Sequence, residues 1–236
     1  MVTSQAKHSS EDARPYLRRF LFLLIALLVT LILGPALEGI PHVRFLVNVF
    51  WTLVLISSVY AVSRNKRVTL IATLLALPFF AAEWSSHFIT SLPVFVAGRV
   101  CAILFFAIVI YHILRFIYGQ QDVRLELVIA AVVVYLLIAT MWAYFYAVLE
   151  TVHPGSFHFP DSASGIMQNR FIYFSFVTIT TLGYGDITPA TGFAASLSVS
   201  EAVIGQLYIT VQVAWLVGIH VASHFEKRSR KASHGE

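Results

Sequence analysis

The sequence predicts an all-α membrane protein with six transmembrane helices and one shorter helix that enters the membrane and returns. Of the 236 residues, 58% are hydrophobic and 12% are charged, whereas about 25% are charged in soluble proteins. Six apolar runs approach the ~20 residues that a helix needs to cross the hydrocarbon core. These runs cover residues 16–37, 43–62, 68–82, 92–116, 123–149 and 193–225.

Apart from Arg44 and Arg170 in the opposite loops and Arg99 within a run, the basic residues lie at alternate ends of these runs. They are Lys7, Arg14, Arg18 and Arg19; Arg64, Lys66 and Arg67; Arg115 and Arg124; and Lys227, Arg228, Arg230 and Lys231. Positively charged loops stay on the cytoplasmic side, so both termini are expected in the cytoplasm of a multi-pass plasma or inner membrane protein. The net charge of +4 then reflects topology and contact with membrane lipids, and no nucleic-acid partner is expected.

The runs divide the chain into four parts. These are a cytoplasmic tail at 1–15, a peripheral four-helix unit at 16–118, a two-helix module at 123–225 and a basic cytoplasmic tail at 226–236. In the two-helix module, the apolar stretch 171–180 follows a polar outer loop and is too short to cross a membrane. Non-helical backbone at membrane depth is tolerated only where protein buries it or where it lines a water-filled cavity. The segment after residue 180 is therefore expected to line a cavity.

Residues 178–189, TITTLGYGDITP, indicate a chemistry for that cavity. Gly183 and Gly185 permit left-handed backbone angles that aim successive carbonyl groups the same way. Four copies of such a strand around an axis would make stacked oxygen cages that replace the water shell of a cation. The expected oxygen donors are the carbonyls of Thr181, Leu182, Gly183 and Tyr184, with the Thr181 hydroxyl.

The stretch TLGYGD at 181–186 resembles the selectivity filter of the tetrameric potassium channel superfamily, and the resemblance extends over roughly 123–225. It implies a homotetramer that conducts K⁺ passively, with an outer helix, a pore helix, a filter and an inner helix in each chain. The implied filter residues are Thr181, Leu182, Gly183, Tyr184 and Gly185, with K⁺ held at the first four. Leu182 replaces the usual valine, a mild departure because the carbonyl meets the ion. No cofactor other than permeant K⁺ is expected.

The resemblance also implies residues that support the filter. Tyr173 and Phe174 match the family's aromatic cuff, and Asp186 flanks the filter. Some relatives carry a glutamate four residues before the filter threonine, where this chain has Val177. Asp186 therefore needs another partner.

Glu201 is an ionisable residue in the outer third of the last apolar run. Such groups are costly in a membrane and mark functional sites. One interpretation places Glu201 behind the filter in its protonated form, where it substitutes for the missing carboxylate. The other makes it a water-facing or helix-packing glutamate satisfied by Ser198 or Tyr173.

Three residues of the inner helix are candidates for a role in opening the channel. Gly205 follows Gly185 at the spacing of the family's hinge glycine, although a glycine that permits close helix packing fits equally well. His220 and His224 lie one turn apart at the cytoplasmic end. Protonation near pH ~6 would charge both histidines beside a gate, which makes them candidates for pH sensing. The alternative is a pair of interfacial histidines that reach the lipid headgroups.

The six-span plan resembles voltage-gated channels, but the fourth run lacks the charge of a sensor. Arg99 and Arg115 are its only arginines or lysines, whereas a sensor moves several arginines through the field. We therefore expect a voltage-sensor-like unit without strong voltage gating, in which Arg99 either pairs with Glu83 or has a weak voltage role. The short link that contains Gly119 predicts that this unit packs against the pore module of its own chain.

No enzyme activity is expected, because the sequence has no phosphate-binding glycine loop, nucleophile with a base, or metal cluster. A second hypothesis is a potassium transporter or transporter subunit. Such relatives usually carry four degenerate filter loops in one chain, whereas this chain has one complete GYG. The number of chains per assembly therefore separates the two hypotheses.

Overall fold

The computed structural model describes residues 14–36, 43–62, 66–85, 92–120, 123–160 and 167–233. Its helices are α2 (Arg14–Ala36), α3 (Val43–Val62), α4 (Lys66–Ser85), α5 (Leu92–Tyr118), α6 (Leu125–Val152), α7 (Met167–Ile179) and α8 (Gly192–Ser233). The two-residue strands β1 (Phe157–His158) and β2 (Thr188–Pro189) pair in antiparallel orientation. The predicted all-α class is confirmed, and most of the tail expected at 1–15 lies outside the described residues.

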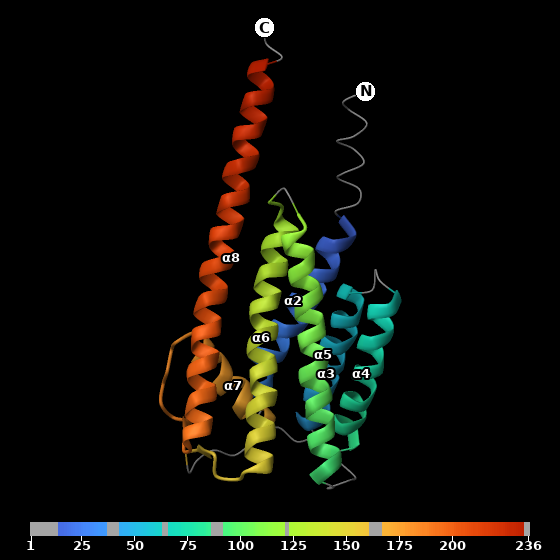
Figure 1. The fold of residues 1–236 in the computed structure, drawn as a ribbon. Coiled ribbons are helices and arrows are strands. Elements are labelled where there is room, and N and C mark those ends of the chain that lie inside the picture. Colours follow the sequence, from blue (N-terminus) through green and yellow to red (C-terminus); the bar gives the residue numbers. More distant parts are fainter. Residues whose placement is uncertain are drawn as a thin grey trace.

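Helix α6 lies between the two halves of the chain and packs against both (Figure 1). Helices α2, α3, α4 and α5 form a bundle on one side of it, and α7 lies between α6 and α8 on the other. The bundle contacts α6 of its own chain, in agreement with the expectation from the short α5–α6 link. Helix α8 continues beyond residue 225, the expected end of the last run, because the segment to Ser233 contains no glycine or proline that would stop it.

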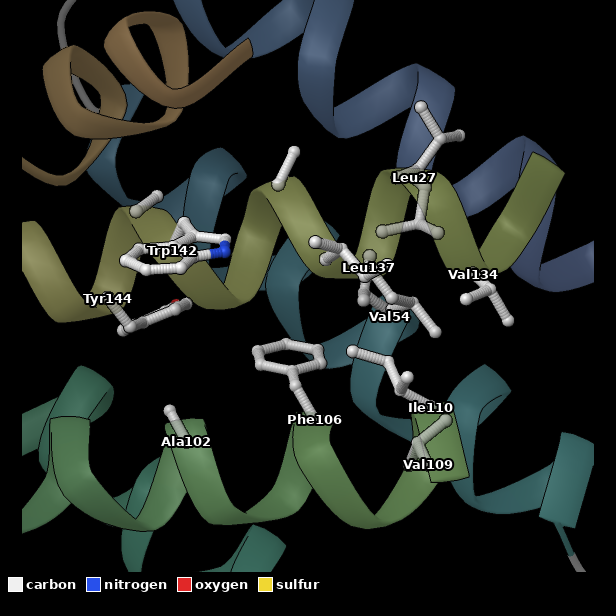
Figure 2. Close-up of a cluster of buried hydrophobic side chains, with 14 of the residues drawn as sticks. Leu27, Val54, Ala102, Phe106, Val109, Ile110, Val134, Leu137, Trp142 and Tyr144 are labelled. Carbon is white, nitrogen blue, oxygen red and sulfur yellow. The ribbon is translucent and has the colours of Figure 1, made fainter. Parts of the chain in front are cut away.

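The core lies where the bundle meets α6 (Figure 2). Helix α5 contributes a stripe at helical spacing that includes Ala102, Phe106, Val109 and Ile113. Tyr144 of α6 completes the core from the other side, since its ring contacts residues of three helices. The ring partners are Trp51 of α3 at 5.8 Å, Phe79 of α4 at 5.2 Å and Phe106 of α5 at 5.8 Å. One side chain of α6 thus holds the bundle together.

Within the described residues, four helices are long and apolar enough to cross a membrane. The spans are Tyr16–Leu33, Leu92–Tyr118, Leu125–Val152 and Gly192–Ser223. Helix α3 has a shorter apolar stretch, Asn48–Ala61, and α4 begins with two basic residues and contains Pro78. Both helices have 20 residues and are therefore about 30 Å long, which matches the hydrocarbon core of a bilayer. We therefore keep six membrane spans as a proposal.

Arg99 is held in place by α6. Its side chain is buried, and its Nη1 donates hydrogen bonds to the Ala147 carbonyl oxygen at 3.1 Å and to the Thr151 hydroxyl. The guanidinium carbon also lies 4.3 Å from the centre of the Phe95 ring. These contacts favour the static role for Arg99, while the Glu83 side chain lies outside the described part of the chain.

Most basic residues of the bundle gather at one end of the molecule, whereas Arg99 lies near the start of α5. Figure 1 shows the start of α2, the α3–α4 junction, the α5–α6 turn and the C-terminal end of α8 at that end. It carries Arg18, Arg19, Lys66, Arg67, Arg115 and Arg124. The loop after α7 lies at the opposite end. This segregation is the one that the charge pattern predicts for a membrane protein with both termini on one side.

Replacing Gly98 with alanine is expected to destabilise the bundle. An added Cβ would lie 2.2 Å from the Cβ of Ala82, where α5 crosses α4 most closely. Overpacking of this kind costs about 1–3 kcal/mol, so thermal unfolding in detergent should occur at a lower temperature. Gly218→Ala is the control, because no atom lies within 4 Å of its added Cβ. Equal stability of the two variants would contradict the close α4–α5 contact.

Candidate functional site

The loop after α7 is held by the end of that helix. The amides of Leu182 and Gly183 both donate to the Val177 carbonyl oxygen, at 3.0 and 3.3 Å. The Thr181 amide donates to the Thr178 carbonyl oxygen at 2.9 Å. Among the described residues, no donor contacts the carbonyl oxygens of residues 181–184. The loop therefore satisfies the amides of Thr181, Leu182 and Gly183 and leaves the carbonyl oxygens of residues 181–184 available to a ligand.

The backbone of this loop alternates in handedness. Thr181, Gly183 and Gly185 have positive φ angles of 59°, 56° and 79°, whereas Leu182 and Tyr184 between them do not. Alternation between left- and right-handed residues turns successive carbonyl groups toward the same side. The glycines were predicted to supply this geometry, but Thr181 was not. A threonine in the left-handed region is uncommon and strained, so the surrounding hydrogen bonds must fix it.

Tyr173 supports the loop in two ways. Its hydroxyl donates to the Asp186 carboxylate at 2.8 Å, and its ring stacks on Tyr184 with centroids 6.5 Å apart. Burial, followed by the hydrogen bond to Asp186, raises the pKa of Tyr173 to about 12. The hydroxyl therefore keeps its proton at neutral pH and acts as the donor. Tyr173 is the partner that the sequence required for Asp186 without identifying it.

A short strand pair fastens the segment after the loop to the end of α6. Phe157 and His158 of β1 pair with Pro189 and Thr188 of β2, and the Ala190 amide donates to the Ser156 carbonyl oxygen at 2.8 Å. Phe157 is buried against Tyr146, Phe171 and Phe174. Phe174 thus packs in a cluster behind the loop, whereas Tyr173 contacts the loop itself. Sequence reasoning missed this strand pair because each strand has only two residues.

Glu201 lies behind α7 and is fully buried. Its Oε2 accepts a hydrogen bond from the Tyr146 hydroxyl at 2.5 Å, and its Oε1 shares a hydrogen bond with Ser175 Oγ. Neither expected partner is used, because Ser198 donates to its own helix at Ala194 and Tyr173 donates to Asp186. The carboxyl therefore joins α8 to α6 and α7 and does not contact Asp186.

Comparison with known protein families gives one match. Residues 123–219 match the family model described as "Ion channel". Residues 123–219 form an ion-channel pore domain. The match begins just before α6 and covers the loop and most of α8. It assigns this part of the chain to ion channels and not to enzymes. No curated protein and no solved structure gives a match.

Gly205 brings the inner helix of the pore domain against the end of α7. A Cβ at this position would lie 2.4 Å from Ile179 Cγ1 and 3.1 Å from the Ile179 carbonyl oxygen. The same carbonyl oxygen accepts a hydrogen bond from Tyr135 of α6 at 3.1 Å. The contact with Ile179 supports the close-packing interpretation of Gly205. Helix α8 is continuous on both sides of this residue.

The two histidines lie farther along α8. His220 is exposed, and the side chain of His224 lies outside the described residues. Between Gly205 and His220, the inner helix meets the bundle: Tyr118 of α5 donates to Gln212 Oε1 at 3.4 Å and packs edge-on against Trp215 at 5.2 Å. The structure therefore adds Tyr118 to the residues that contact the half of α8 that follows Gly205.

Tyr173→Phe is expected to weaken the outer mouth of the pore domain. The variant keeps the stack on Tyr184 but loses the bond to Asp186, which contributes about 1 kcal/mol. The ratio of K⁺ to Na⁺ flux into liposomes should fall by about fivefold. Tyr111→Phe, at an exposed position of α5, controls for loss of a hydroxyl. An unchanged ratio in Tyr173→Phe would show that Asp186 needs no partner.

Gly205→Ala separates the two interpretations of that glycine. The added methyl must displace Ile179, so the assembly should lose about 1–3 kcal/mol of stability and unfold at a lower temperature. Gly218→Ala is the control in the same helix, where the added Cβ meets open space. A Gly205→Ala protein as stable as the control, but closed in flux measurements, would instead support a hinge.

Proposed function

We propose that the protein is a potassium-selective channel that conducts K⁺ passively through a filter at residues 181–185. The observation that carries this proposal is the run of carbonyl oxygens at 181–184 that contact no donor among the described residues. The positive φ angles at Thr181, Gly183 and Gly185 support an arrangement in which these carbonyls share one side. Rings of such carbonyls replace the hydration shell of K⁺ in selective filters. The resemblance of TLGYGD to the potassium channel filter selects K⁺ among cations.

The proposed assembly is a homotetramer. Each chain supplies one filter strand, and a cage of carbonyl oxygens around an ion needs four. Helix α8 buries one narrow stripe against its own chain, formed by Ala194, Glu201, Gly205 and Gln212. Much of the rest of its apolar surface is exposed in a single chain, including Val199, Val203, Leu207, Val211 and Val217. In a tetramer this surface faces the pore, the neighbouring chains and lipid.

The proposed location is the plasma or inner membrane with both termini in the cytoplasm. The basic end of the molecule then faces the cytoplasm, and the filter lies toward the outside. Strong voltage gating is not part of the proposal, because Arg99 is bonded to α6 and Arg115 lies exposed in the last turn of α5. Proton sensing by His220 and His224 stays a prediction.

Flux through the purified protein in liposomes tests the proposal. With Na⁺ as the competing ion, we expect K⁺ flux to exceed Na⁺ flux by more than about tenfold, because selective filters reject the less well coordinated ion. Flux should be followed at internal pH from about 5 to 8, the range in which histidine titrates. Equal K⁺ and Na⁺ flux, or no flux at any pH, would overturn the proposal.

Gly183→Ala in the same assay links selectivity to the filter backbone. At a φ of 56°, an added Cβ costs about 1–2 kcal/mol. The carbonyl groups proposed to bind K⁺ should therefore lose their alignment, and the ratio of K⁺ to Na⁺ flux should fall to near one. Gly192→Ala is the matched control, since Gly192 begins α8 without a positive φ and its added Cβ meets no atom within 4 Å. Native mass spectrometry should show four chains; a conducting monomer would favour the transporter hypothesis.

A further inference from the structure

A buried cluster of hydroxyl and carboxyl groups joins three helices behind the proposed filter. Glu201 Oε2 of α8 lies 2.5 Å from the Tyr146 hydroxyl of α6, and Glu201 Oε1 is hydrogen-bonded to Ser175 Oγ of α7. Ser175 Oγ also lies 2.6 Å from the Ala139 carbonyl oxygen of α6. Each of these three contacts joins two oxygen atoms at hydrogen-bond distance, so each needs one hydrogen.

The number of hydrogens determines the charge of the carboxyl group. A carbonyl oxygen supplies no hydrogen, and the serine and tyrosine hydroxyls supply one each. An ionised carboxylate supplies none, which would leave two hydrogens for three contacts. A neutral carboxylic acid supplies the third. Because Ala139 can only accept, the Ser175 hydrogen belongs to that contact, and the hydrogen between Ser175 and Glu201 comes from Glu201.

The surroundings of the carboxyl group agree with this count. Glu201 is fully buried, and among the described residues no basic side chain contacts it. From α6, Tyr146 bonds it and Tyr135 lies close enough to interact with a charge on it, while α7 presents the uncharged Ser175. Asp186 is bonded to Tyr173. A carboxylate at membrane depth without a cation is strongly unfavourable, whereas a neutral acid with both oxygens hydrogen-bonded is not.

We propose that Glu201 is a neutral carboxylic acid and a positioning residue for the filter, acting through Ser175. Ser175 precedes by two residues Val177, whose carbonyl oxygen holds the Leu182 and Gly183 amides. Fixing Ser175 therefore fixes α7 and, through Val177, the filter backbone. The effect on conduction rests on the proposed function of this pore domain, whereas the protonation state of Glu201 does not.

Three variants test the positioning role in the liposome flux assay. In Glu201→Gln the amide nitrogen donates to Ser175 and the amide oxygen accepts from Tyr146, so flux and selectivity should stay within about twofold of the unmodified protein. Glu201→Ala and Ser175→Ala leave buried groups unpaired, and K⁺ flux per assembly should fall by about tenfold or more. Thr30→Val is the control, because Thr30 is a buried hydroxyl of α2 that bonds only Ala26 of its own helix.

Infrared difference spectroscopy tests the protonation state without flux. The spectrum of the unmodified protein minus that of Glu201→Gln should show the carbonyl band of a protonated carboxylic acid at neutral pH. Carboxylate bands in its place would overturn the proposal, as would a Glu201→Gln variant as impaired as Glu201→Ala. If the unmodified protein shows no selective flux, the proposed function fails, and the infrared result still decides the charge of Glu201.

Discussion

The structure of the pore domain depends on two hydrogen bonds to one atom, the Val177 carbonyl oxygen. A helix leaves its last carbonyl groups without partners in the helix, and a membrane offers no water to satisfy them. Here the amides of Leu182 and Gly183 supply those partners. These two bonds hold the loop after residue 180 against the end of α7 where the chain leaves the helix. The carbonyl oxygens of residues 181–184 accept no hydrogen bond from the described residues, which keeps them available to a ligand.

The supports around this turn come from every neighbouring element. Tyr173 and the β1–β2 pair hold the outer side, Ser175 and Glu201 the rear, and Tyr135 with Gly205 the inner end at Ile179. Helix α6 can serve both the bundle and the pore domain because residues two apart point to roughly opposite faces of a helix. Tyr144 packs against α3, α4 and α5, and Tyr146 reaches Glu201 on the other side.

The sequence predicts those features of the fold that depend on local residue patterns. The apolar runs located the helices, the short run at 171–180 located α7, and the glycine spacing indicated the turned backbone at 183 and 185. It could not assign the partners of Asp186 and Glu201, because Tyr173 and Tyr146 reach them through the directions in which distant helices present their side chains. The left-handed Thr181 was also missed, since its conformation follows from hydrogen bonds to α7 and not from its own preference. At Gly205 the sequence allows a hinge or close packing, and the contact with Ile179 supports close packing.

The contact between the bundle and α8 joins the four-helix unit, whose helix α5 has no ladder of arginines, to the pore domain. A single arginine carried across the whole membrane field supplies only about 2.3 kcal/mol per 100 mV. Arg99 would first have to break its hydrogen bonds to Ala147 and Thr151. Tyr118, at the other end of the same helix, contacts Gln212 and Trp215 in the half of α8 that follows Gly205. These uncharged side chains join α5 to the half of α8 that follows Gly205, whereas Arg99 near the other end of α5 is bonded to α6.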